Sequence, residues 1–167
     1  MGRRPQLTVI GSSGVIPREL EEVAERVGEA IARRGAILIC GGRDGVMLAA
    51  ARGAKRAGGI TVGILPGVRH EEANPFIDII IPTGLLFARN AVNVLAGDAV
   101  IAVGGGPGTL SEIALALSYG RPVVVVKGTG GAADLMAGRE IGGCRVHAAS
   151  DPEEAVELAL RLAGFSR

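Results

Sequence analysis

Short apolar runs rich in β-branched residues alternate along the chain with longer segments in which apolar residues recur every three or four positions. A continuous apolar run indicates a strand buried on both faces, and the three-to-four spacing predicts an amphipathic helix. The predicted strands are residues 7–10, 36–40, 60–65, 76–81, 99–103, 122–126 and 144–149. The predicted helices are residues 18–34, 46–57, 85–96 and 109–119, and a last helix that begins after Asp151.

Strands that alternate with helices predict an α/β fold with a mostly parallel sheet. We expect residues 1–167 to form a single Rossmann-like, doubly wound domain with about six or seven strands flanked by helices. The glycine-rich connection over residues 127–143 is expected to hold at most one helical turn. At the last helix, Asp151 is the predicted N-cap, with Pro152 at the first position and Glu154 completing a capping box.

Composition narrows the classes of partner and location. The net charge of +1 and the scattered basic residues predict no nucleic-acid partner. No run reaches the roughly 20 apolar residues that span a bilayer, and residues 1–14 lack the apolar segment of a signal peptide. We therefore expect a cytoplasmic protein with no membrane partner. Cys40 and Cys144 are interpreted as small buried thiols, and the loop with His70, Glu71 and Glu72 as solvated, with no metal site.

Glycines gather where predicted strands end, in the segments "GSSG", "GGRDG", "GGGPGT" and "KGTGG". The carboxyl ends of parallel strands meet at one edge of the sheet, where doubly wound folds bind ligands. Glycines there let backbone N–H groups approach an anion, and a following helix adds the positive end of its dipole. Thr109 is expected to cap its helix and to donate to a phosphate oxygen. The residues predicted to bind a phosphorylated small molecule are Gly11, Ser12, Ser13, Gly41, Gly42, Arg43, Gly45, Gly104, Gly105, Gly106, Gly108 and Thr109.

Two common nucleotide motifs do not fit these loops. A P-loop requires a glycine, four intervening residues and then Gly-Lys-Ser/Thr, and no Gly-Lys pair follows Gly104 or Gly105 at that spacing. The dinucleotide fingerprint places Gly-x-Gly-x-x-Gly after the first strand and an acidic residue after the second. This chain has "GSSG" after the first strand and Cys40 at the end of the second. The sequence therefore argues against a nicotinamide or flavin dehydrogenase.

Glu112 and Arg89 each have two interpretations. Glu112 follows Thr109 closely, so it either stabilises the start of its own helix or faces a ligand in the crevice. Arg89 lies near the start of an otherwise apolar helix. It is either a surface side chain whose apolar stem covers its neighbours, or an anion clamp and a partner that keeps Glu112 ionised.

The segment "GGGPGTLSE" resembles the Pro-Gly-Gly-x-Gly-Thr-x-x-Glu motif of the LOG family of cytokinin-activating nucleoside 5′-monophosphate phosphoribohydrolases, formerly labelled lysine decarboxylases. "ICGGRDGVMLAAARGAKRAGG" and "ARNAVNVLAGDAVIAVGGG" resemble two further segments of that family. The resemblance covers roughly residues 7–126 and implies catalytic roles for Arg89 and Glu112 if the chain is a hydrolase. Asn90 occupies the position of the family's lysine and is added to the predicted binding residues; Gly104 occupies that of its first proline.

"GSSG", "GGRDGVM", "FARN" and "GGGPGTLSE" are most similar to a branch of shorter chains that includes the molybdenum cofactor carrier proteins. That resemblance implies a Rossmann-like homo-oligomer that binds a phosphorylated pterin and has no required cofactor. We therefore expect binding of a phosphorylated nucleotide-like or molybdopterin-type ligand. The alternative is hydrolysis of the N-glycosidic bond of a nucleoside 5′-monophosphate.

Two further interpretations concern the old decarboxylase label and the quaternary structure. Pyridoxal phosphate chemistry needs a Schiff-base lysine, and neither Lys55 nor Lys127 has a supporting motif. Helix 109–119 is apolar on more than one face, which predicts a homodimer or homotetramer. It also leaves open an interaction protein whose crevice is vestigial.

Overall fold

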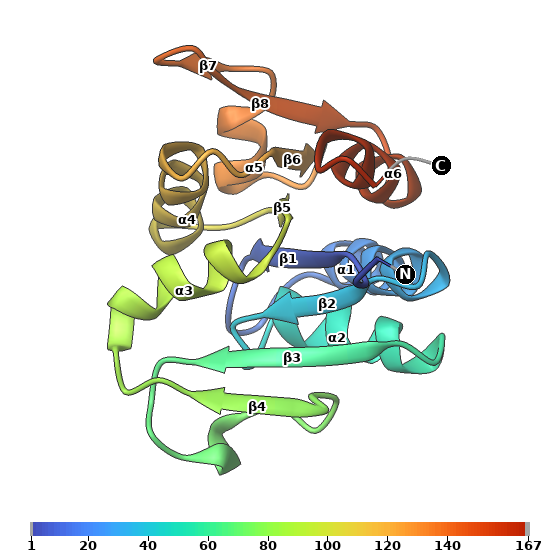
Figure 1. Ribbon diagram of the computed structural model, residues 1–167, viewed down its shortest axis with the longest axis vertical. Coiled ribbons are helices and arrows are strands. Elements are labelled where there is room, and N and C mark those ends of the chain that lie inside the picture. The colour runs from blue at the N-terminus through green and yellow to red at the C-terminus, as the bar shows by residue number, and fades with distance from the viewer. Residues whose placement is uncertain (1, 166–167) are drawn as a thin grey trace.

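The computed structural model describes residues 2–165, in which strands and helices alternate (Figure 1). The strands are β1 (Gln6–Gly11), β2 (Ile37–Cys40), β3 (Ile60–Leu65), β4 (Ile79–Pro82), β5 (Ala99–Val103), β6 (Val123–Val126), β7 (Glu140–Ile141) and β8 (Cys144–Ala149). The α-helices are α1 (Arg18–Arg33), α2 (Val46–Arg56), α3 (Arg89–Ala96), α4 (Pro107–Ser118), α5 (Gly131–Met136) and α6 (Pro152–Leu162). Two short 3-10 helices are η1 (His70–Glu72) and η2 (Leu86–Ala88).

The eight strands form one sheet in the order β4-β3-β2-β1-β5-β6-β8-β7. Every pairing is parallel except that of β7 with β8. The predicted α/β fold with a mostly parallel sheet is confirmed, with slightly more strands than expected. The strand order reverses between β1 and β5, and ligands of doubly wound sheets bind at the carboxyl ends of strands beside such a reversal.

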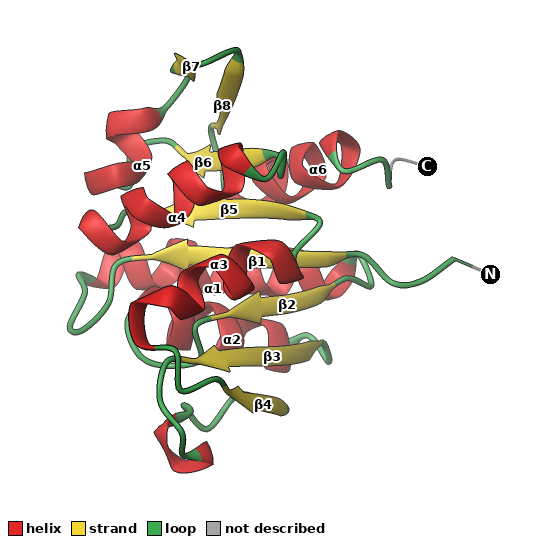
Figure 2. Cartoon of the chain, turned by 60° about the vertical axis from the view of Figure 1, so that its left-hand side comes forward, coloured by secondary structure: helices red, strands yellow, loops and turns green. Residues whose placement is uncertain are grey.

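Helices cover both faces of the sheet (Figure 2). One buried cluster joins α1, α2 and α6 to the sheet, and the other joins α3, α4 and α5 to the opposite face. The fully buried large side chains are all leucine, isoleucine and valine, as the chain's low aromatic content predicts. This aliphatic core holds the strand ends, and therefore the loops that follow them, in fixed positions.

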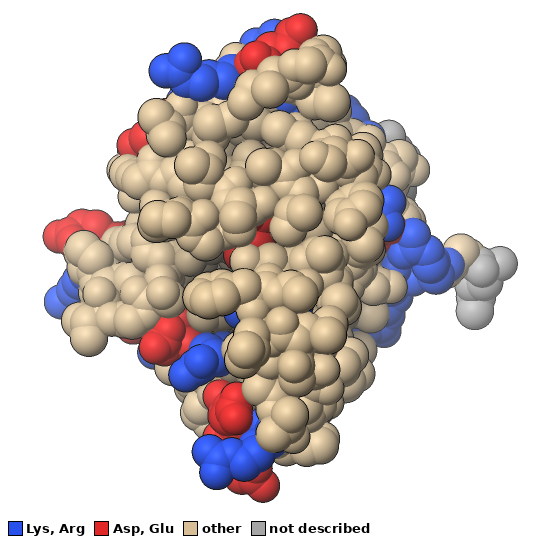
Figure 3. All heavy atoms as spheres, turned by 90° about the vertical axis from the view of Figure 1, so that its left-hand side faces the viewer, with Lys and Arg blue, Asp and Glu red and all other residues tan. Residues whose placement is uncertain are grey.

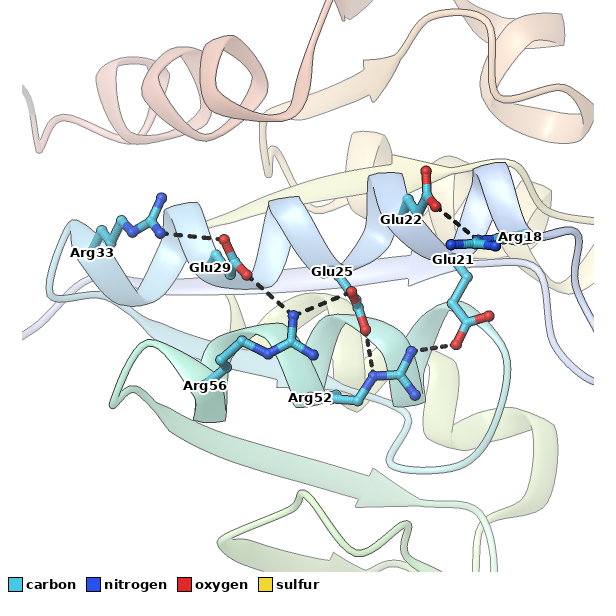
Figure 4. A network of polar contacts seen from close by, with 8 residues as sticks. All are labelled: Arg18, Glu21, Glu22, Glu25, Glu29, Arg33, Arg52 and Arg56. Carbon is cyan, nitrogen blue, oxygen red and sulfur yellow. Dashed lines mark hydrogen bonds and ion pairs between the residues drawn. The ribbon is translucent and has the colours of Figure 1, made fainter.

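Helices α1 and α2 pack unusually close to each other. A Cβ atom added at Gly28 of α1 would lie 1.9 Å from the carbonyl oxygen of Ala50 in α2. On the exposed side of this contact, Arg52 pairs with Glu21 and Glu25, and further ion pairs extend along both helices (Figure 4). Exposed pairs contribute about 0–1 kcal/mol each, so the backbone contact is the stronger constraint.

Three predicted boundaries are wrong by two residues or more, and the first two lie at the candidate site. The helix expected over residues 85–96 is divided into η2 and α3, so Arg89 is the first residue of α3. The helix expected over residues 109–119 begins at Pro107, where the missing N–H of proline costs nothing. Its N-cap is Gly106, so Thr109 does not cap it. The strand expected over residues 76–81 begins only at Ile79.

The connection over residues 127–143 holds more structure than expected, because it contains both α5 and β7. At α6 the predicted cap is confirmed: the Glu154 N–H donates to Asp151 Oδ1 at 2.8 Å. The Glu154 carboxylate accepts from the N–H of Ser150 at 2.8 Å rather than from that of Asp151.

The two cysteines are free and differ in exposure. Cys40 is buried as predicted, and burial raises the pKa of its thiol to about 12. Cys144 is only half-buried, because it lies next to the exposed two-residue strand β7. Within residues 2–165, no three histidine, cysteine or acidic side chains come together in a way that could hold a metal ion. None of the helices in that range has the length and apolar character needed to cross a membrane.

Candidate functional site

A cavity of about 240 Å³ lies at the carboxyl ends of β1 and β5, where the strand order reverses. Its lining brings together many of the residues predicted from sequence and adds several others. The lining residues are Val9, Ile10, Gly11, Ser13, Gly41, Met47, Phe87, Arg89, Asn90, Asn93, Gly106, Pro107, Gly108, Thr109 and Glu112. Figure 3 faces the side toward which β1, β2 and β3 run, and the surface there is mostly uncharged.

The N-terminus of α4 supplies the anion-binding groups of this cavity. Gly106 is the N-cap, and the first helical hydrogen bond runs from the Leu110 N–H to the Gly106 carbonyl at 3.0 Å. The N–H groups of Gly106, Gly108 and Thr109 precede that bond and therefore have no intrahelical acceptor. These N–H groups, with the positive end of the helix dipole, form a subsite suited to a phosphate.

The first two glycines of "GGGPGT" support this subsite from behind. The Gly104 N–H donates to Thr129 Oγ1 at 2.9 Å, and the Gly105 N–H donates to Ser12 Oγ at 2.8 Å. Gly105 has a φ of +106°, and a Cβ atom there would lie 2.4 Å from the Thr109 side chain. Ser12, Gly104 and Gly105 thus shape the loop without lining the cavity, and direct ligand contacts from them remain a prediction.

The segment "GGRDG" contributes less to the anion subsite than its glycines suggest. The Val46 N–H at the start of α2 donates to the Ser12 carbonyl at 2.9 Å. Gly42 and Gly45 have positive φ and form the turn, while Gly41 alone of this segment lines the cavity. Arg43 is exposed and lines a neighbouring cavity of about 510 Å³.

Arg89 points inward and joins the ends of two strands. Its Nη1 donates to the carbonyl of Gly41 at 2.9 Å and to that of Ile64 at 2.6 Å. The pKa of its guanidinium is lowered by burial, against the opposing influence of Glu112. The surface interpretation of Arg89 is therefore wrong. Its buried Nε has no hydrogen-bond partner within the described chain, which leaves a donor unsatisfied close to the cavity.

Glu112 does not stabilise the start of its own helix. Because α4 begins at Pro107, Glu112 is its sixth residue and lies beyond the first turn. Its Oε2 accepts from Asn93 Nδ2 on α3 at 2.8 Å. Burial raises the pKa of the Glu112 carboxyl to about 7, although Asn93 and Arg89 both oppose the rise. Glu112 is thus divided between its neutral and charged forms near neutral pH.

Asn90, at the position of the lysine in the LOG motif, is buried and donates through Nδ2 to Ser111 Oγ at 3.2 Å. The missing lysine leaves Arg89 as the one cationic side chain that the described residues contribute to the lining of the cavity at α4. The side chain at this position therefore contributes polarity and shape but no charge.

Sequence reasoning missed Asn93, Met47 and Phe87. Asn93 is 2% exposed, and its Oδ1 has no partner among the described residues. Its spacing of four from Arg89 puts the two on one face of a helix, a signal that the sequence did contain. Phe87 is 88% exposed and follows Leu86, whose φ of +52° is uncommon for a residue with a side chain and costs roughly 1–2 kcal/mol.

Residues 4–156 match the SLOG cluster4 family. The chain belongs to this family. It is 49% identical over 122 residues to an uncharacterized protein of Archaeoglobus fulgidus, a match that covers 73% of this chain and 80% of that one. It is 38% identical over 117 residues to the cytokinin riboside 5′-monophosphate phosphoribohydrolase of Mycobacterium tuberculosis, across 65% of this chain and 63% of the enzyme.

Solved structures similar to this SLOG cluster4 chain include proteins whose names refer to the molybdenum cofactor. The molybdenum cofactor binding protein of Rippkaea orientalis is 40% identical with a TM-score of 0.86, covering 96% of this chain and 98% of that chain. The molybdenum cofactor carrier protein of Chlamydomonas reinhardtii is 39% identical with a TM-score of 0.83, covering 95% and 98%. The resemblance to the LOG superfamily and to the carrier branch is confirmed.

Proposed function

We propose that the chain binds a phosphorylated nucleotide-like or pterin ligand, of which a molybdopterin-type molecule is one, in the cavity at the start of α4. The observation that carries the proposal is the set of N–H groups of Gly106, Gly108 and Thr109, which begin α4 beside Arg89 and Glu112. The cofactor-binding relatives, which match nearly the whole chain, support the pterin alternative. We place the protein in the cytoplasm, as its composition predicts.

The charges of the cavity suit one end of such a ligand. Backbone N–H groups and the dipole of α4 favour a phosphate without a lysine. The guanidinium of Arg89 adds a full positive charge within the same lining. Glu112 in its neutral form can donate a hydrogen bond to the uncharged part of the ligand.

The test is to identify what the protein retains when it is purified gently. We expect native mass spectrometry to find a phosphorylated small molecule bound to the chain. Members of a panel of nucleoside monophosphates and pterins that bind should then raise the unfolding temperature, and at equal concentration tighter ligands should raise it more. If no phosphorylated compound binds or shifts the unfolding temperature, the proposed function is wrong.

Replacing Gly108 by aspartate should separate binding from folding. The residue lies in the first turn of α4, and a Cβ atom there meets no protein atom within 4 Å. An acidic residue near a helix N-terminus stabilises the helix by about 0.3–1 kcal/mol, but its charge repels a phosphate. We expect Gly108→Asp to fold normally and to bind AMP at least about 10-fold more weakly by calorimetry, the equivalent of ~1.4 kcal/mol.

The matched control is Gly108→Asn, which has the same shape without the charge. It should bind AMP much more tightly than Gly108→Asp, and the difference should shrink as salt is added. Equal affinities of the two variants would place the phosphate away from the N-terminus of α4.

Glu112 favours a second candidate, cleavage of the N-glycosidic bond of a nucleoside 5′-monophosphate. The bond between the sugar carbon and the base would break, the departing base would take a proton, and water would add its hydroxyl to the sugar carbon while its other proton returns to the carboxylate. A carboxyl with a pKa of about 7 can supply that proton, and in its ionised form it can stabilise positive charge on the sugar. Release of free base from AMP over a long incubation is the assay. Glu112→Gln should abolish the release while the chain still binds AMP, and absence of release from the native protein eliminates this candidate.

An apolar groove of about 590 Å³ between α4, α5 and β7 supports a homodimer or homotetramer. Leu110, Leu135 and Ile141 are large exposed side chains in its lining. Sedimentation at micromolar concentration should show more than one chain per particle, and a monomer would contradict the proposal.

A further inference from the structure

Phe87 lies where two cavities meet. It lines the cavity at the start of α4 and also the neighbouring cavity of about 510 Å³. The two linings share Ser13, Met47, Phe87 and Arg89. With three phenylalanines, one tyrosine and no tryptophan in the sequence, an aromatic ring that is 88% exposed at this place is unusual for this chain.

The sizes of the cavities indicate that a ligand would occupy both. Pockets for small molecules and cofactors are typically about 300–1,000 Å³. The cavity that holds the free N–H groups of α4 has only about 240 Å³, which suits a phosphate and a sugar better than a whole nucleotide. A larger ligand bound by its phosphate therefore has room to extend past Phe87 and Met47 into the second cavity.

The turn that carries Phe87 is held in place by hydrogen bonds. The Leu86 N–H donates to the Pro66 carbonyl at 3.0 Å, and the Ala88 N–H donates to the Leu85 carbonyl at 3.1 Å. Leu86 keeps a positive φ of +52° within this turn. Backbone strain that the surroundings maintain is concentrated at functional sites, and here the strained residue directly precedes the exposed ring.

We propose that Phe87 is the stacking surface for the planar heteroaromatic ring of the phosphorylated ligand, with Met47 as a second apolar wall of the same passage. The inference rests on the proposed function, since the phosphate at α4 fixes where the ring lies. Aromatic faces and a thioether both pack favourably against planar rings. The exposed Arg43 guanidinium at the second cavity then meets the polar edge of the ring.

The test compares GMP with ribose 5-phosphate, which has the same phosphate and sugar but no heteroaromatic base. GMP is chosen because guanine shares the fused aminopyrimidinone of a pterin. Calorimetry would measure both probes on the native chain, on Phe87→Ala and on Phe87→Tyr. We expect Phe87→Ala to weaken GMP about 10-fold, as loss of a stacking contact does, and to leave ribose 5-phosphate unchanged. Phe87→Tyr keeps an aromatic face and should bind GMP as the native chain does.

The control variant is Val68→Ala, which shortens an exposed apolar side chain outside both linings and should change neither affinity. If Phe87→Ala and the native chain bind GMP equally, the stacking inference is wrong while the proposed function stands. If Phe87→Ala instead converts a larger particle to a smaller one in sedimentation, Phe87 belongs to an interface between copies and the inference is also wrong. If GMP, ribose 5-phosphate and every other phosphorylated compound of the panel fail to bind the native chain, the proposed function itself fails.

Discussion

Glu112→Gln is expected to unfold at a higher temperature than the native chain at pH 8, by several degrees. Burial raises the pKa of the folded carboxyl from 4.5 to about 7, so its charged form is disfavoured in the folded state. At 1.36 kcal/mol per pKa unit, this costs on the order of 3 kcal/mol once Glu112 is ionised. Glutamine has nearly the same shape, can still accept from Asn93 Nδ2, and carries no charge.

The pH dependence gives this prediction its sign. Below about pH 4.5 the carboxyl is protonated whether the chain is folded or unfolded, and the native chain and Glu112→Gln should differ little. Between pH 4.5 and 7 the unfolded chain binds fewer protons than the folded one, so the stability of the native chain falls as pH rises. Above pH 7 the difference in stability between Glu112→Gln and the native chain stays at its full value. Thermal unfolding of both proteins from pH 5 to pH 8 measures it.

Glu22→Gln is the matched control, because Glu22 is an exposed carboxylate that pairs with Arg18 on the surface of α1. It should show no comparable gain at pH 8. If Glu112→Gln is instead less stable than the native chain at pH 8, attraction between Glu112 and Arg89 outweighs burial. Glu112 would then be a permanent carboxylate, able to stabilise positive charge on a sugar but unable to donate a proton at neutral pH.

The fold could be predicted from sequence because the apolar runs are continuous and each is followed by glycine or a small polar residue. The start of α4 could not, although Pro107 marks it, because the glycines around it suggest a longer loop. That single error changed the meaning of Glu112: counted from Thr109 it lies in the first turn, and counted from Pro107 it lies beyond it. A shift of two residues thus separated a capping role from a contact with α3.

The site could be located from sequence, but the particular N–H groups and side chains available to a ligand could not be identified. Three of the four glycine-rich strand ends line one cavity, while the fourth, "KGTGG", only supports it, through Thr129, which accepts from the Gly104 N–H. Which N–H groups are free depends on contacts between distant segments: Thr129 and Ser12 accept from Gly104 and Gly105 and leave the later groups of the loop available. Asn93 was missed because the resemblance assigned roles only to Arg89 and Asn90 in this helix, although Asn93 follows Arg89 by four residues and lies on the same helical face.

Gly28→Ala is expected to destabilise the chain by about 2 kcal/mol or more, although alanine is the better helix former. The change gains about 1 kcal/mol of helix propensity. The added methyl group would lie 1.9 Å from the Ala50 carbonyl oxygen, a backbone atom that can move only if the whole of α2 moves. Overpacking commonly costs 1–3 kcal/mol and more where the backbone must shift. Denaturant unfolding at neutral pH measures the loss.

Gly108→Ala is the matched control, since a Cβ atom there meets no protein atom within 4 Å and the same substitution should be neutral or stabilising. Adding 1 M salt to the native chain screens the exposed ion pairs of α1 and α2. The free energy of unfolding lost in this way should be smaller than the loss caused by Gly28→Ala. The effect should also reach the site, because α1 follows the loop with Ser13 and Met47 is the second residue of α2. If Gly28→Ala is as stable as the native chain, the close backbone contact is not the main constraint between α1 and α2. The ion pairs would then hold the two helices together, and the loops that precede them could shift.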